Sequence, residues 1–100
     1  MDIKIQSIHF DADEKLVQFI EERVGKLRQF FDHIINVEVY LKIDKAAVNG
    51  NKIVEIKLGI PGKDLFASKQ CDSFEEATDE SVEALRKQIR KHKGKMLSKH

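Results

Sequence analysis

The residues best suited to binding chemistry lie at the end of the sequence, where positive charge is concentrated. Between residues 83 and 100 there are seven lysines and arginines and one acid, Glu83, which gives a net charge of +6. Residues 1–82 carry 11 basic and 16 acidic residues, a net charge of −5, so the total of +1 conceals two parts of opposite sign. A dense block of one charge attracts ligands of the other sign. This segment therefore predicts a polyanion-binding surface made by Arg86, Lys87, Arg90, Lys91, Lys93, Lys95 and Lys99.

Signals for catalysis are weak by comparison. The four histidines and the single cysteine, Cys71, show no metal-ligand spacing such as HExxH or CxxC. Residues 61–63 lack the Gly-x4-Gly-Lys-Ser/Thr pattern of a phosphate-binding loop, and no pair of carboxylates is singled out for acid–base work. Cys71 is either a reactive thiol or, more simply, a small half-buried residue at the end of a strand. We expect no enzyme activity, no metal, no cofactor and no small-molecule substrate.

Length and composition suit a single domain over residues 1–100. One cysteine rules out an internal disulfide, which fits a reducing compartment. The first residues, MDIKIQSIHFD, have neither the basic region nor the apolar run of a signal peptide. No apolar run approaches the roughly 20 residues that a membrane span needs. We therefore expect a cytoplasmic protein with no membrane partner.

The charged surface needs a scaffold, and the sequence predicts two amphipathic helices for it. The first covers residues 12–31, and Asp11 and Glu14 have the spacing of a capping box at its start. Gly25 is a weak point inside this helix, where it costs roughly 1 kcal/mol relative to alanine. A wide apolar stripe is predicted to pack flat on something large; it consists of Leu16, Val17, Phe19, Ile20, Val24, Leu27, Phe30 and Phe31.

The second helix is predicted over residues 74–93 and carries the basic segment. Ser73 and Glu76 form a second capping-box pattern before it, and Gly94 is a plausible end. At about 100° per residue, the basic side chains cover nearly all of the non-core half of its last turns. One arc is predicted to anchor the helix in the core; it consists of Phe74, Ala77, Thr78, Ser81, Val82, Leu85 and Ile89.

Alternating apolar residues predict four strands, over residues 2–8, 36–44, 52–60 and 64–70. Asn49-Gly50 and Pro61-Gly62 are turn signals between the last three strands, which are therefore expected to be antiparallel. The first strand reaches its neighbour through a helix and can pair in parallel by a right-handed crossover. The order β-α-β-β-β-α predicts an α+β fold, a four-stranded sheet with two helices packed on one face.

A charge run is usually no more than a solvated helix face, and three observations argue against that here. The charge has one sign, it occupies about three turns, and the rest of the chain has the opposite sign. Arg23 and Lys26 of the first helix would extend the surface if the two helices lie side by side. Few aromatic residues and a folded surface favour recognition of phosphates and RNA shape over the reading of bases.

Two segments resemble a known family. The stretches GKLRQFFDHIINVEVYLKIDK (residues 25–45) and LRKQIRKHKGK (residues 85–95), with the element order, resemble the ribosome hibernation-promoting factors. That family includes protein Y and proteins once called sigma-54 modulation proteins. The resemblance implies a fold like that of double-stranded-RNA-binding domains. It also implies binding in the mRNA and tRNA channel of the small ribosomal subunit, which blocks translation in stationary phase or stress.

The resemblance also implies which residues face ribosomal RNA. Lys87 stands where the family usually has arginine, so a charge is kept and a bidentate fork is lost. Glu75 and Glu76 make the start of the last helix more acidic than in most relatives. The implied RNA-binding residues are Arg23, Lys26, Arg86, Lys87, Arg90, Lys91, His92 and Lys93.

The chain stops soon after the last helix, so the resemblance is to a short family form without the second domain of long members. The expected partners are the small ribosomal subunit, through its RNA and neighbouring proteins, and a separate ribosome modulation factor. Two other functions stay open at this point. One is a generic binder of structured RNA, and the other is a protein-interaction regulator of a sigma factor, which would not need a basic helix.

Overall fold

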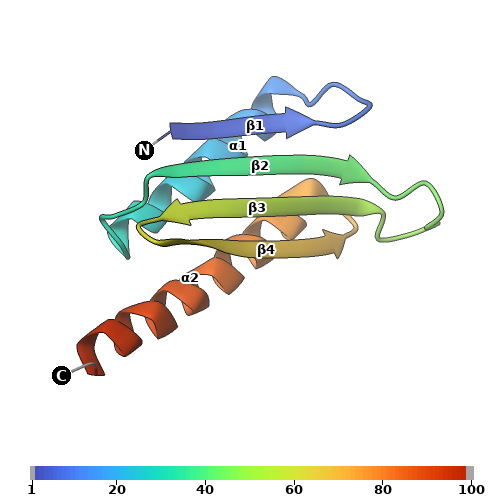
Figure 1. Cartoon of the computed structure of the whole chain (residues 1–100). Coiled ribbons are helices and arrows are strands. Elements are labelled where there is room, and N and C mark those ends of the chain that lie inside the picture. The colour runs from blue at the N-terminus through green and yellow to red at the C-terminus, as the bar shows by residue number, and fades with distance from the viewer. Residues whose placement is uncertain (1, 99–100) are drawn as a thin grey trace.

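The computed structural model describes residues 2–98, with side chains as far as Gly94 (Figure 1). The side chain of Lys95 and the whole of Lys99 and His100 lie outside the described residues. The predicted order β-α-β-β-β-α and the α+β class are confirmed. No helix in this described range is long and apolar enough to cross a membrane. The elements are β1 (Asp2–Ser7), α1 (Glu14–Gly25), the short 3-10 helix η1 (Lys26–Gln29), β2 (Asn36–Ile43), β3 (Lys52–Ile60), β4 (Lys63–Cys71) and α2 (Phe74–Ser98).

The four strands form one sheet in the order β1-β2-β3-β4. β1 pairs with β2 in parallel, with Ile5 opposite Val39, and α1 makes the crossover between them. β3 pairs antiparallel with both β2 and β4. This mixed sheet is the one that the hairpin signals and the helical crossover predict.

Both helices cover the same face of the sheet (Figure 1). Alternate strand residues point into that layer because side chains along a strand face opposite sides. α1 lies behind β1 and β2, whereas α2 lies behind β3 and β4 and extends past the sheet. The fully buried side chains of this core include Ile20 of α1, Leu27 of η1, Val39 of β2, Ile56 and Leu58 of β3, and Ala77 and Leu85 of α2.

The first helix is shorter and less regular than predicted. Its N-cap is Asp13, whose side chain accepts a hydrogen bond from the backbone of Lys15, so the prediction that Asp11 caps it is wrong. The α-helix ends at Gly25, and the chain tightens into η1. Glycine is a poor helix former, and a 3-10 turn is a common way to finish a helix. The tightening leaves Phe30 40% exposed, although the apolar stripe predicted that it would be buried.

The second helix continues to Ser98 and does not end near Gly94. Gly94 does not have the positive φ that a terminating glycine adopts, since among the glycines of the described residues only Gly50 and Gly62 do. At the other end, Ser73 Oγ accepts a hydrogen bond from the Glu76 backbone at 3.1 Å, as the capping pattern predicts. The Glu76 carboxylate accepts a hydrogen bond from the backbone N–H of Asp72 at 3.4 Å.

Replacing Gly25 with alanine is expected to stabilise the fold by about 0.5–1 kcal/mol. The backbone there is right-handed helical, and an added Cβ would meet nothing within 4 Å. Alanine therefore reduces the entropy of the unfolded chain without creating a clash. Urea unfolding of the two proteins measures the difference. A loss of stability would show that this junction needs a more flexible residue than the geometry suggests.

Candidate nucleic-acid interface

The basic residues of α2 divide around its buried stripe. Leu85 and Ile89 face the sheet, and helical spacing places the cations on the two sides of this line. Arg86, Arg90 and Lys93 lie on the side of η1 and line a hollow next to Phe30. Lys87 and Lys91 come before and after Gln88, which donates a hydrogen bond to the Phe66 carbonyl of β4 at 2.8 Å. Four of these cations are exposed: Lys87, Arg90, Lys91 and Lys93.

Arg86 is the least available of these cations. Its Nε donates to Glu83 at 2.8 Å and its Nη2 donates to the other oxygen of the same carboxylate. The hydrogen bond lowers the pKa of Glu83 and raises the pKa of Arg86. The guanidinium also lies over the Phe30 ring, 5.7 Å from its centre. Arg86 is therefore held in place, with much of its charge balanced by Glu83.

Lys93 and His92 connect α2 to the end of η1. The Lys93 ammonium donates a hydrogen bond to the Phe30 carbonyl at 2.9 Å, which satisfies an acceptor at the end of the short helix. An ammonium has three donors, so two of them stay available for a ligand. The half-buried His92 ring meets Phe31 edge to face, with 5.7 Å between the ring centres. This contact gives His92 a packing role.

The first helix contributes fewer free cations to the basic surface than predicted for two helices that lie side by side. α1 and α2 do pack against each other, but Arg23 meets the acidic part of α2, where its Nη1 lies 3.3 Å from Asp79. The same guanidinium lies 4.5 Å from the centre of the Phe19 ring. Lys26, at the start of η1, is exposed and makes no ion pair among the described residues.

Helix stability explains only part of the charge pattern on α2. Acids near the start and bases near the end of a helix both interact favourably with its dipole, by about 0.3–1 kcal/mol each. This effect is confined to the first and last turns. Lys87, Arg90 and Lys91 lie about two turns or more before Ser98, where the helix ends. The helix dipole therefore does not account for these three cations.

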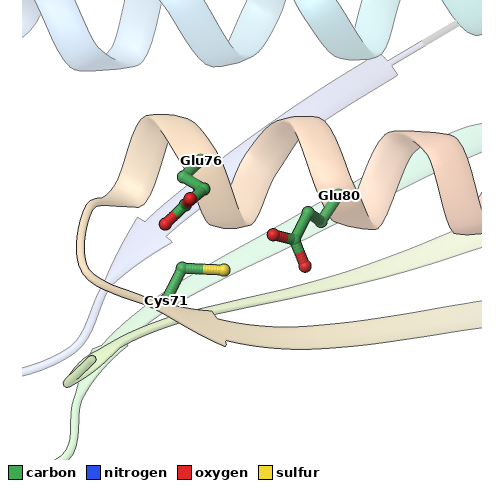
Figure 2. A group of neighbouring side chains, drawn as sticks. All are labelled: Cys71, Glu76 and Glu80. Atoms are coloured by element: carbon green, nitrogen blue, oxygen red, sulfur yellow. The ribbon is translucent and has the colours of Figure 1, made fainter.

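The acidic end of α2 brings Cys71, Glu76 and Glu80 together (Figure 2). One atom of each that can bind a metal lies within 4.8 Å of the others, a grouping that the sequence spacing did not indicate. Desolvation raises the pKa of Cys71 to about 11, and a hydrogen bond to Glu80 adds to the shift. The thiol is therefore protonated at neutral pH and donates to a carboxylate. This favours the simpler interpretation of Cys71, a half-buried residue at the end of β4.

Alkylation of Cys71 by iodoacetamide is expected to be slow. With the pKa at about 11, its thiolate fraction at pH 8 is about 100-fold below that of a thiol at the reference value of 9.0. Replacing Glu80 with glutamine should accelerate the reaction, because a hydrogen-bonding carboxylate and its charge are removed. Mass spectrometry over time measures both rates. A wild-type rate equal to that of a free thiol would contradict the raised pKa.

Comparison with known proteins places this geometry in a family. Residues 3–97 match the family described as Sigma 54 modulation protein / S30EA ribosomal protein. A ribosome hibernation promoting factor of Pseudomonas putida is 30% identical over 98 residues, covering 98% of this chain and 92% of that protein. The factor of the same name from Escherichia coli K12 is 28% identical over 96 residues, covering 96% of this chain and 97% of the relative. The similarity extends over nearly the whole of each relative.

Two solved structures share the fold. A ribosomal subunit interface protein from Coxiella burnetii superposes with a TM-score of 0.84 at 23% identity, covering 94% of this chain and 99% of that one. The N-terminal domain of protein Y from Thermus thermophilus gives a TM-score of 0.79 at 19% identity, covering 92% and 99%.

Proposed function

Because the chain belongs to the Sigma 54 modulation protein / S30EA ribosomal protein family, we propose that it is a ribosome hibernation factor. In this proposal it binds the small ribosomal subunit in the channel used by mRNA and tRNA, and blocks translation in stationary phase or stress. The observation that carries the proposal is the group of exposed cations on α2, Lys87, Arg90, Lys91 and Lys93. The names of the relatives support the ribosome as the partner.

The proposed mechanism is occlusion without bond making. Leu85 and Ile89 fix α2 to the sheet, so its cations form a rigid surface with a defined spacing. Such a surface neutralises phosphates of ribosomal RNA along the channel wall and releases their counterions. The bound domain then fills the space that mRNA and tRNA would occupy. The surrounding partners are ribosomal RNA and neighbouring ribosomal proteins, and the site of action is the cytoplasm.

No catalytic role is part of this function. The family consists of hibernation factors that are not enzymes. Within the described part of the chain, the possible metal-binding group of Cys71, Glu76 and Glu80 contains a protonated thiol at neutral pH. The activity is thus an equilibrium property, set by affinity and by competition with translation substrates.

A binding comparison tests the proposal against the two alternatives. Purified small ribosomal subunits and a short RNA duplex are titrated separately with the labelled protein, at 50 and at 200 mM salt. We expect much tighter binding to the subunits, and an affinity that falls on the order of 10³-fold between the two salt concentrations if six or more phosphates are contacted. Equal affinity for the subunits and for the RNA duplex would favour a generic binder of structured RNA. No binding to either would favour a protein-interaction regulator.

A further inference from the structure

A hollow between η1 and α2 has a composition that the phosphate-binding surface does not require. It is lined by Phe30, Ile89 and Gly94, together with the cations Arg86, Arg90 and Lys93. Its volume is about 360 Å³, near the lower end of the roughly 300–1,000 Å³ of small-ligand pockets. Phosphate binding alone needs no apolar floor, so the aromatic surface here calls for an additional explanation.

The floor is an aromatic ring held in a fixed position. Phe30 is 40% exposed because the chain leaves η1 there, although its neighbours Leu27 and Phe31 are buried. The Lys93 ammonium binds the Phe30 carbonyl, and the Arg86 guanidinium lies over the Phe30 ring. Contacts from α2 thus fix both the backbone and the ring. A rigid exposed ring is a stacking platform that loses little entropy when a flat ligand binds.

The rim of the hollow carries charge of one sign. Its lining residues include three cations and no carboxylate. Glu83 balances much of the charge of Arg86, whereas Arg90 is exposed and forms no ion pair within residues 2–94. Lys93 keeps two donors beyond the one that it gives to Phe30. The hollow therefore suits a ligand with a flat apolar body and an attached anion.

We propose that the hollow binds one unpaired nucleotide of an RNA strand, with its base stacked on Phe30 and its phosphate between Arg90 and Lys93. The inference rests on the proposed function, because it names how the same surface engages RNA. A base inside a duplex is covered by its neighbours, so only an unstacked nucleotide can place its face on the ring. Stacking on an aromatic ring tolerates any base, because every base has a π-face.

Nuclear magnetic resonance of the isotope-labelled chain tests the hollow directly. The probes are hexa-adenylate RNA, adenosine monophosphate and ribose 5-phosphate, which has the sugar and phosphate but no base. We expect hexa-adenylate to shift the ring protons of Phe30 and the methyl groups of Ile89, with contacts between base and ring protons. Ribose 5-phosphate should leave the chemical shifts of the Phe30 ring protons unchanged. Equal shifts with both, or shifts confined to other surfaces, would overturn the proposal.

Adenosine monophosphate shows whether the nucleotide in the hollow belongs to an RNA strand or is a free nucleotide. An RNA strand offers flanking phosphates to Arg90 and neighbouring cations, so hexa-adenylate should bind at least tenfold more tightly than adenosine monophosphate. Tighter binding of the monophosphate would assign the hollow to a free nucleotide and overturn the RNA assignment.

Substitution of Phe30 by leucine separates stacking from charge on the ribosome itself. Leucine keeps an apolar floor but removes the aromatic face, so affinity for small subunits should fall about tenfold. The dependence of affinity on salt should stay unchanged, because no phosphate contact is lost. Wild-type affinity in this variant would overturn the nucleotide site alone. Failure of the wild-type chain to bind subunits would overturn the proposed function. The hexa-adenylate titration would still show whether the hollow binds a nucleotide.

Discussion

Simultaneous replacement of Lys87, Arg90 and Lys91 with glutamine is expected to reduce affinity for small ribosomal subunits about 10²–10³-fold near 0.1 M salt. All three side chains are exposed, and none forms an ion pair among the described residues. Each phosphate contact releases counterions. At 0.1 M salt this release raises the affinity nearly tenfold relative to 1 M salt. The slope of log affinity against log salt should become shallower by about three. Fluorescence anisotropy over a salt series measures both quantities.

The matched control removes the same amount of charge elsewhere. Lys4, Lys45 and Lys69 are exposed and lie on β1, in the loop between β2 and β3, and on β4. Their replacement with glutamine should leave the slope nearly unchanged, because these lysines are outside the basic segment of α2. If both triple variants lose affinity equally, net charge alone would explain binding, and the assignment of the interface to α2 would be wrong.

Replacement of Leu85 with alanine is expected to lower the free energy of unfolding by about 2–5 kcal/mol. Leu85 is completely buried and lies in the stripe that fixes the basic half of α2 to the sheet. Removal of its side chain leaves a cavity and weakens that attachment without changing any charge. Urea or thermal unfolding gives the difference. Binding to small subunits should weaken at temperatures where the variant unfolds and recover on cooling.

An exposed position on the same helix supplies the comparison. Replacement of Lys91 with alanine should change the free energy of unfolding by no more than about 0.5 kcal/mol. If Leu85→Ala is equally mild, α2 is not anchored as the structure indicates. If the variant stays bound while its core is unfolded, a flexible basic tail would suffice, and the rigid surface would not be required.

Much of the fold follows from patterns that repeat along the chain. Val37, Val39 and Leu41 alternate with polar residues, and this period places them on the buried face of β2. The capping residue Ser73 likewise marked the start of α2. These features depend on residues close in sequence, so a linear pattern is enough to reveal them.

The features that were missed depend on local backbone geometry and on contacts between distant residues. The exposure of Phe30 follows from the change at Gly25 from an α-helix to a 3-10 helix, which apolar periodicity does not detect. The pairing of Arg23 with Asp79 joins residues 56 positions apart, so the sequence showed a free cation where the structure has an ion pair. Gly25, a glycine inside a predicted helix, is the one sequence signal for the exposure of Phe30.

Competition on the small subunit tests the central claim most directly. Labelled protein is sedimented with purified small ribosomal subunits that are either empty or saturated beforehand with mRNA and tRNA. We predict that the protein sediments with empty subunits and stays in the supernatant when the channel is occupied. Equal sedimentation with empty and occupied subunits would contradict the account, because it would place the binding site outside the channel.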